Sequence, residues 1–333
     1  MRVLIAGDIG GTKTNLGLFS LEGGPRSPLE EATYRSADYA SLEKICAEFI
    51  AATGAKVSFG AFGVAGPVSG TRASITNLPW IIESDTVRSA LSLTKAVVMN
   101  DLESIAYGIA LLDDKDLHVL SSGDVHPGGP RAIIAPGTGL GEAYLTWNGS
   151  RYRAHPSEGG HADFAPTNVH ELALLRHLMG RFDHVSVERV CSGSGIPNIY
   201  TFLKEEHLCD EPARYAEQLA NAPDKTAHIL STALDEQQAP EICTRTLEMF
   251  LSILGAETGN LALKILATGG IYLGGGILPR ILPAVNKSSF LDSFLNKGRL
   301  SPILKHIPIS VILNPNVALM GTALVGLEMM ETM

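Results

Sequence analysis

The sequence has no closely spaced pair of cysteines. Its four cysteines, Cys46, Cys191, Cys209 and Cys243, stand far apart, and no CxxC segment occurs. A zinc ribbon or a thioredoxin-type redox site needs such pairs, so the sequence supports neither class. We expect reduced thiols, as in a cytosolic protein.

A long hydrophobic run is also missing. The apolar stretch at residues 3–6 ends at Gly7 and Asp8, and it is too short for the core of a signal peptide. The apolar C-terminal third is interrupted by Glu257 and Lys264, which argues against a membrane span. We therefore expect a cytoplasmic protein that does not bind a membrane.

Positive charge is scarce. The chain has 26 Lys and Arg against 35 Asp and Glu, a net charge of −9, and no run of five or six like charges. Nucleic-acid binding requires clustered Lys and Arg to neutralise phosphates. We therefore expect no nucleic-acid partner.

Glycine, in contrast, is abundant. The 333 residues include 34 glycines, with 45% hydrophobic and 18% charged residues. Such a length corresponds to about two domains of ~150 residues, and the composition is that of a globular protein. The glycines predict tight turns or close approaches of the backbone to a ligand.

Strand and helix patterns alternate along the chain, which predicts an α/β fold with ligands at the strand ends. We expect strands at residues 3–6, 16–19, 57–64, 96–99, 133–135, 143–145, 271–273 and 309–313. We expect helices at residues 41–52, from 101 onward, through most of 166–235, at 242–267 and at 318–330. The helix at 242–267 is expected to be interrupted or loosened at Gly255 and Gly259.

Two glycine-rich loops each join a strand to another strand. They are GDIGGTKT at residues 7–14 and PGTGLG at residues 136–141. A Walker loop and a dinucleotide-binding fingerprint both open a helix, so neither loop is of those types. Hairpin loops of this kind expose backbone N–H groups to an anion, and their recurrence suggests a duplicated fold.

These loops belong to a longer series of motifs. In order they are GDIGGTKT (7–14), TNLPW (76–80), NDLES (100–104), PGTGLG (136–141), EGGHADFAP (158–166), ERVCSGSG (188–195) and LGGGILPR (273–280). The series resembles that of the bacterial glucokinases, members of the hexokinase–actin–chaperone ATPase superfamily, over residues 7–321. EGGHADFAP and ERVxSGxG are specific to this group, whereas GDIGGT alone marks the wider superfamily. Small departures are Pro136 and the pair Leu102-Glu103.

The resemblance implies an α/β fold of two ribonuclease-H-like (actin-like ATPase) domains that flank an interdomain cleft. We place residues 1–108 and 315–333 in a small domain with the first phosphate loop and the catalytic Asp. Residues 109–314 form the large domain, with the second phosphate loop and the sugar and adenosine contacts. A sister group of sugar kinases carries a cysteine-rich zinc motif, which this chain lacks.

The activity implied by the resemblance is ATP-dependent phosphorylation of D-glucose at its 6-hydroxyl. Phosphoryl transfer asks the protein to position the hydroxyl, accept its proton and neutralise phosphate charge. The resemblance places the general base of this in-line transfer at Asp101. The alternative for Asp101 is structural, because an Asp at the start of a helix is a common N-cap.

Sugar binding is expected from residues on three motifs. Glu158 and His161 lie three apart in a glycine-bent loop and could converge on one polyol. The resemblance implies that they and Glu188 hold the hydroxyls near the anomeric carbon, while Asn100 and Asp101 hold the far end.

Other interpretations exist for Asn100, Glu188 and His161. Asn100 could be an ordinary residue at a strand end, and Glu188 a solvated charge at a helix end. His161 with Asp163 is a poor metal site, because no third ligand lies at a familiar spacing.

ATP and Mg²⁺ are the implied cofactors. Asp8, beside the first loop, could hold Mg²⁺ through its water molecules, since Mg²⁺ keeps most of its hydration shell. Thr12 and Thr138 with the loop amides would contact the β- and γ-phosphates, and residues 274–276 would let adenosine lie against bare backbone. The expected nucleotide-binding residues are Gly7, Asp8, Ile9, Gly10, Gly11, Thr12, Gly137, Thr138, Gly139, Gly274, Gly275 and Gly276.

Two alternative functions remain at this point. One is a kinase for another hexose, because a few hydrogen bonds decide the choice of sugar. The other is a non-catalytic sugar-binding regulator of the same fold, which Asp101 and the lack of a DNA-binding segment disfavour. We expect glucose and ATP as ligands and, from the frequency of twofold assemblies, a homodimer.

Overall fold

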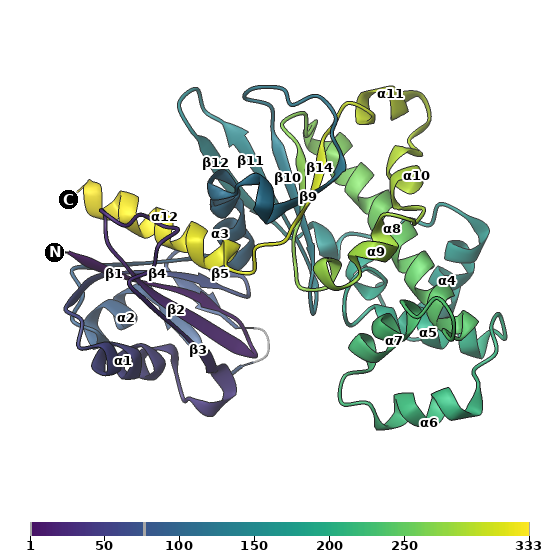
Figure 1. Cartoon of the computed structure of the whole chain (residues 1–333), viewed down its shortest axis with the longest axis horizontal. Helices are drawn as coiled ribbons and strands as arrows, with labels where there is room; N and C mark the ends of the chain where they lie inside the picture. The colour runs from purple at the N-terminus through teal and green to yellow at the C-terminus, as the bar shows by residue number, and fades with distance from the viewer. Residues whose placement is uncertain (1, 76–77, 333) are drawn as a thin grey trace. The chain divides into compact units, whose positions relative to one another are not determined.

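The structure is a computed structural model that describes residues 2–75 and 78–332 (Figure 1). Thr76 and Asn77, which begin the TNLPW motif, lie outside the described residues. The chain packs into two compact units. The first contains the residues up to Leu117, Ser150–Pro156 and the residues from Asn314 onward, and the second contains His118–Gly149 and Ser157–Leu313. The domain boundaries expected after residues 108 and 314 stay a prediction.

The first unit is built on a sheet with strand order β3-β2-β1-β4-β8. β1 pairs antiparallel with β2 and parallel with β4, and β4 pairs parallel with β8. The strands are β1 (Val3–Ile9), β2 (Lys13–Phe19), β3 (Glu30–Arg35), β4 (Val57–Val64) and β8 (Lys95–Asn100). A small separate sheet contains β5 (Val68–Ser69), β6 (Arg72–Ser74) and β7 (Ile81–Glu83).

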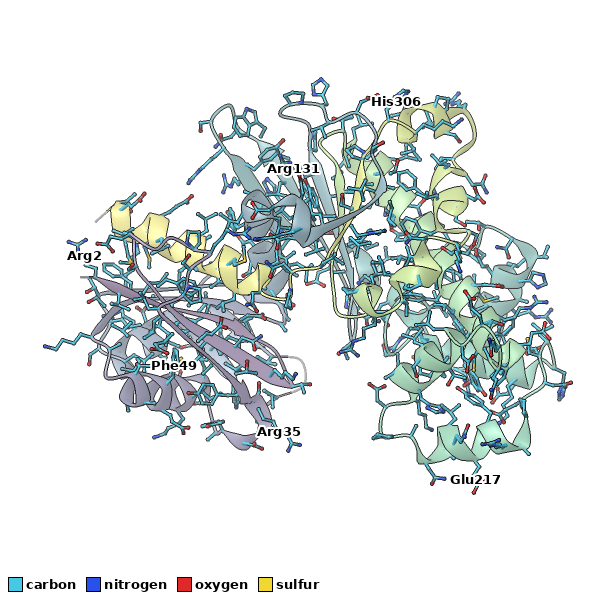
Figure 2. The ribbon with its side chains drawn as sticks, in the orientation of Figure 1. Arg2, Arg35, Phe49, Arg131, Glu217 and His306 are labelled. Atoms are coloured by element: carbon cyan, nitrogen blue, oxygen red, sulfur yellow. The ribbon has the colours of Figure 1, made fainter. Side chains whose placement is uncertain are left out.

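Helices cover both faces of this sheet (Figure 1). They are α1 (Leu42–Thr53), α2 (Ser84–Ala90), α3 (Asp101–Gly108) and α12 (Val317–Glu331). Successive side chains of a strand point to opposite faces, so β1 serves two cores. Ile5 packs in the cluster that includes Phe49 of α1, labelled in Figure 2, whereas Leu4 packs in the cluster with Leu319 and Leu327 of α12.

A second sheet repeats this plan, in the strand order β12-β11-β10-β13-β14-β9. β10 pairs antiparallel with β11 and parallel with β13, and β13 pairs parallel with β14. The order from β12 to β14 therefore matches the order from β3 to β8, which supports the duplication suggested by the two glycine loops. The strands are β9 (Leu117–Ser121), β10 (Arg131–Pro136), β11 (Leu140–Trp147), β12 (Tyr152–Ser157), β13 (Ile271–Leu273) and β14 (Ile309–Ile312).

The remaining helices belong to the second unit and share a large apolar core with its strands. They are α4 (Val169–Met179), α5 (Ile196–Glu205), α6 (Ala213–Asn221), α7 (Lys225–Ala233), α8 (Glu241–Ile265), α9 (Leu282–Val285), α10 (Phe290–Leu295) and α11 (Ser301–Leu304). Short 3₁₀ turns occur at Ser36–Asp38, Ile109–Leu111, Asp114–Asp116, Gly159–His161, Val187–Arg189, Leu278–Arg280 and Gly298–Leu300. The predicted helical character of residues 166–235 is confirmed.

The expected interruption of the long helix is wrong, because α8 runs unbroken over 25 residues. A Cβ atom at Gly255 would overlap the carbonyl oxygen of Phe290, and one at Gly259 would lie 2.6 Å from the carbonyl oxygen of Phe294. The two glycines therefore let the backbone of α10 approach α8 closely.

Two expectations from composition can be compared with the structure. Among residues 2–75 and 78–332, no helix combines the length and the apolar character needed to cross a membrane. All four cysteines lie in the described part of the chain, where they are buried free thiols.

Gly255→Ala should destabilise the second unit. The added methyl group overlaps main-chain atoms of α10, and overpacking of this kind costs about 1–3 kcal/mol, which exceeds the ~1 kcal/mol that Ala contributes to helix propensity. Calorimetry should show a lower Tm. Gly180→Ala is the control, because the nearest atom to its Cβ is 3.4 Å away; equal Tm values for the two variants would contradict this account of α8.

Candidate active site

The first glycine loop is shorter than its sequence pattern indicates. β1 continues through Gly7, Asp8 and Ile9 and pairs with β2 as far as Ile9 opposite Thr14, so the expectation that these three residues belong to the loop is wrong. Gly7 is enclosed, since a Cβ there would lie 2.8 Å from the Ile9 side chain and 2.9 Å from that of Leu16. The role of these residues in nucleotide binding stays a prediction.

Gly10, Gly11 and Thr12 form the turn itself. The N–H of Gly10 donates to the carbonyl oxygen of Lys13 at 2.9 Å and closes the turn. Buried Ser36 supports it from outside, because its hydroxyl donates to the Gly10 carbonyl at 2.7 Å and its N–H donates to the Thr12 carbonyl at 3.1 Å. Sequence reasoning missed Ser36, which lies beyond β3 and carries no local signal.

Asp8 presents a carboxylate just before this turn. It lies opposite Asn15 in the strand pair, and the Asn15 amide donates to Asp8 Oδ2 at 3.2 Å. Burial raises the pKa of the Asp8 carboxyl, and the bond from Asn15 opposes that rise. No group of three His, Cys, Asp or Glu side chains that could hold a metal ion occurs in residues 2–75 and 78–332. A single carboxylate nevertheless fits a hydrated Mg²⁺, which needs few protein ligands.

Asn100, not Asp101, is the N-cap of α3. Asn100 Oδ1 accepts from the N–H groups of Leu102 at 2.9 Å and Glu103 at 3.4 Å, and its amide donates to the carbonyl oxygen of Gly66 at 3.1 Å. The alternative that Asp101 is the N-cap is therefore wrong. Asp101 is the first residue of the helix, and its Oδ1 accepts from the Leu102 N–H at 2.9 Å.

The second glycine loop is held from the side by the SGSG segment. The N–H of Gly137 donates to the Gly139 carbonyl at 2.9 Å within the loop. The N–H of Gly193 donates to the Gly137 carbonyl at 2.7 Å, and that of Ser194 to the Thr138 carbonyl at 3.2 Å. A Cβ at Gly193 would lie 2.8 Å from the Gly137 oxygen, so a glycine is needed for this contact.

Glu188 reaches the same loop from the 3₁₀ turn Val187–Arg189. Its Oε2 accepts from the N–H of Leu140 at 2.9 Å, and there is no room for a Cβ on Gly139 beside this carboxylate. The alternative that Glu188 is merely a solvated charge is wrong. A carboxylate proposed to bind sugar is thus attached to the loop proposed to bind phosphate.

Glu158 and His161 lie at the two ends of a short turn that follows β12 and packs against β11. The N–H of His161 donates to the Glu158 carbonyl at 3.0 Å. The side chain of Glu158 is 74% exposed and that of His161 is 61% exposed, and 4.0 Å separate His161 Nε2 from Glu158 Oε2. Gly159 packs against the Glu142 carboxylate and Gly160 against the Leu140 carbonyl, where a Cβ would overlap. The glycines therefore hold the turn on the strand while both polar side chains project from it.

Asp163 does not join His161. Its Oδ1 accepts a hydrogen bond from His184 Nε2 at 2.8 Å.

A cavity of about 1200 Å³ opens beside the second loop, within the second unit. Its walls come from the glycine loop and SGSG segment, from α6 and α7, and from the chain after β13. These wall residues include Gly137, Thr138, Gly193, Ser194, Gln218, Asp224, Thr226, His228, Leu230, Gly276, Ile277 and Arg280. α6 is the helix on which Figure 2 labels Glu217.

Of the three predicted adenosine glycines, Gly276 is in the cavity wall. Gly275 has a φ of +82° and lies against the carbonyl oxygen of Pro136, and the N–H of Gly274 donates to the Ile134 carbonyl at 2.9 Å. Sequence reasoning missed the wall residues of α6 and α7, because their pattern is that of any amphipathic surface helix. Thr226 Oγ1 fixes α7 to the second loop region by donating to the Gly193 carbonyl at 2.6 Å.

Comparison with known proteins gives a consistent result. A sequence model of the glucokinase family matches residues 5–329. Glucokinase from Nostoc punctiforme is 40% identical over 338 residues, which cover 97% of this chain and 98% of that protein. The glucokinase structure from an Antarctic psychrotroph has a TM-score of 0.81 at 29% identity, covering 98% of this chain and 99% of the other.

A more distant structure shows the same fold. It is a ROK family glucokinase from Streptomyces griseus in complex with glucose and AMPPNP, with a TM-score of 0.65 at 22% identity, covering 98% of this chain and 99% of the other. The α/β fold expected from the resemblance is confirmed by these structural matches.

Asn100→Ala should lower the free energy of unfolding by about 1 kcal/mol, because it removes an N-cap, and it also removes the bond to Gly66. Asn100→Asp is the matched control, since a carboxylate oxygen caps a helix about as well. Thermal melting of both variants checks this expectation. Equal losses in the two variants would mean that the cap contributes nothing and that the bond to Gly66 accounts for the effect.

Proposed function

The chain belongs to the glucokinase family and is a sugar kinase that phosphorylates glucose, and we propose that it transfers the γ-phosphoryl group of ATP in line to the glucose 6-hydroxyl with Asp101 as general base. The homodimer and the cytoplasmic location stay predictions. The domain boundaries expected after residues 108 and 314 also stay predictions.

The position of Asp101 carries this proposal. Its carboxylate lies on the first turn of α3, while Asn100 caps the helix. In phosphoryl transfer a carboxylate of this kind accepts the proton of the attacking hydroxyl as the oxygen–phosphorus bond forms. Because Asn100 is the N-cap at the start of α3, the capping role does not explain an acid at the next position.

The cavity of the second unit supports the use of ATP. It has ample volume for a nucleoside, and Gly137, Thr138 and Gly276 are in its wall. Backbone N–H groups of a glycine loop bind phosphate oxygens. The base and ribose would lie toward α6 and α7, and the phosphates toward the loop at Thr138.

Mg²⁺ would neutralise charge on the transferred phosphoryl group when bound. Asp8 is the residue that would hold it, through coordinated water. The bond from Asn15 to Asp8 Oδ2 orients this carboxylate.

The sugar would be held by the carboxylate, imidazole and amide groups of five residues. Glu158, His161 and Glu188 lie in the second unit, and Asn100 and Asp101 in the first. Exposed Glu158 and His161 are free to turn toward a polyol, whereas Glu188 is already oriented by the Leu140 N–H.

Asp101→Asn should lower kcat by at least about a hundredfold, because general-base catalysis contributes ~10²–10⁴ in rate. Glucose should still bind, since an amide can donate to or accept from a hydroxyl. A coupled assay for glucose 6-phosphate with ATP as donor measures the rate, and Tm should not change. Asp85→Asn, at the second residue of α2, is the control and should keep full activity. If a folded Asp101→Asn protein keeps most of its turnover, Asp101 is not the general base.

Glu158→Ala and His161→Ala should each raise the KM for glucose. Loss of a hydrogen-bonding partner in a closed complex costs about 1–3 kcal/mol, whereas the Kd for ATP should hardly change, because neither residue lines the cavity. His306→Ala, which removes an exposed histidine paired with Asp124, is the control. Calorimetry that found weaker ATP binding with unchanged glucose binding would overturn this assignment of the turn.

A further inference from the structure

Glu142 is a buried acid that the proposed mechanism does not use. It lies on β11 opposite Ile134 of β10, and it is 2% exposed. Its Oε2 lies against Gly159, where a Cβ would overlap it. Its Oε1 is buried and has no hydrogen-bond partner among the described residues. The carboxyl group therefore fills the space directly beneath the turn that carries Glu158 and His161.

The surroundings of Glu142 compensate a negative charge on it only in part, through Lys264. From α8 it faces Glu257, whose own carboxylate is already bound to Lys264 at 3.5 Å and to the Asn260 amide at 2.9 Å. From the loop after Val187–Arg189 it faces the buried thiol of Cys191. The titratable groups of the turn, Glu158 and His161, are both largely exposed.

This setting alters the acidity of Glu142. Burial raises the pKa of its carboxyl to about 7, the charge of Glu257 contributes to the rise, and Lys264 opposes it. The side chain is therefore a neutral acid below about pH 7 and a carboxylate above it. An unpaired buried carboxylate is costly, so ionisation favours displacement of the side chain toward water or toward Lys264.

We propose that Glu142 is a positioning residue for glucose binding, and that its neutral form supports the turn that presents Glu158 and His161. This inference rests on the proposed role of that turn in holding the sugar. When Glu142 ionises and leaves its place under Gly159, the turn loses its support. Glucose binding should therefore weaken as the pH rises through 7, while ATP binding, in a cavity that Glu142 does not line, should not follow.

The test compares Glu142→Gln with Glu142→Val in the full-length enzyme. Gln has the shape of the neutral acid and does not ionise, so the KM for glucose should match that of the wild type at pH 6 and should not rise by pH 8. The wild-type KM should rise several-fold over the same range. Val is neutral but too short to reach Gly159, and its KM for glucose should be raised several-fold at both pH values. The KM for ATP should be unchanged in both variants.

Two further measurements separate Glu142 from other titrating groups. Glucose binding to the wild type near pH 7 should take up protons, as calorimetry in buffers of different ionisation enthalpy reports. Glu142→Gln should abolish this proton uptake. His161→Gln should weaken glucose binding but retain most of the proton uptake. Glu236→Gln, at an exposed acid paired with Lys287, is the control and should behave as the wild type.

Stability gives a reading that does not depend on activity. Because the folded state binds the Glu142 proton more tightly than the unfolded chain, ionisation destabilises the fold as the pH rises from about 4.5 through 7. Glu142→Gln should therefore raise Tm relative to the wild type more at pH 8 than at pH 5.

The possible failures are distinct. If Glu142→Gln shows the same rise of the glucose KM with pH as the wild type, and Glu142→Val leaves that KM unchanged, Glu142 does not position the turn. If Glu158→Ala and His161→Ala leave the glucose KM unchanged, the proposed role of the turn fails, and this inference fails with it.

Discussion

One hydrogen bond, from the N–H of Leu140 to the carboxylate of Glu188, joins the two functions of the second unit. Leu140 begins β11 directly after the second glycine loop, and Glu188 is the carboxylate proposed to hold glucose. A bond to an ionised acceptor is stronger than a neutral one, so it fixes the loop and the carboxylate relative to each other. Phosphate and sugar contacts proposed for this unit therefore depend on a common geometry.

Glycines make this arrangement possible because they allow other segments to approach the main chain closely. Gly193 lies against the Gly137 carbonyl, Gly160 against the Leu140 carbonyl, and Gly139 beside the Glu188 carboxylate. Each of these glycines belongs to a motif for which the sequence predicts a role in ligand binding. Their shared physical role is packing between segments, and the N–H groups proposed to bind phosphate are held in place by that packing.

In the first unit, two adjacent residues have different roles, one structural and one proposed to be chemical. Asn100 satisfies the exposed N–H groups at the start of α3 and binds the Gly66 carbonyl. Asp101 follows on the first turn. Capping does not explain an acid at this position, which is in line with the chemical role proposed for it. Asp8 shows a similar local support, since Asn15 on the neighbouring strand holds its carboxylate.

Local patterns in the sequence were enough to predict the strands of both hairpins, most helices, the α/β class and the motifs that carry Asp8, Asp101, Glu158 and Glu188. These features depend on residues close together in the chain, whose periodicity or spacing is visible. Tertiary structure alone decided the support of the first turn by Ser36, the attachment of Glu188 to Leu140, the unbroken course of α8 at Gly255, and the burial of Glu142 under Gly159. Each of these is a contact between segments far apart in sequence, and such contacts leave no periodic signal in either segment.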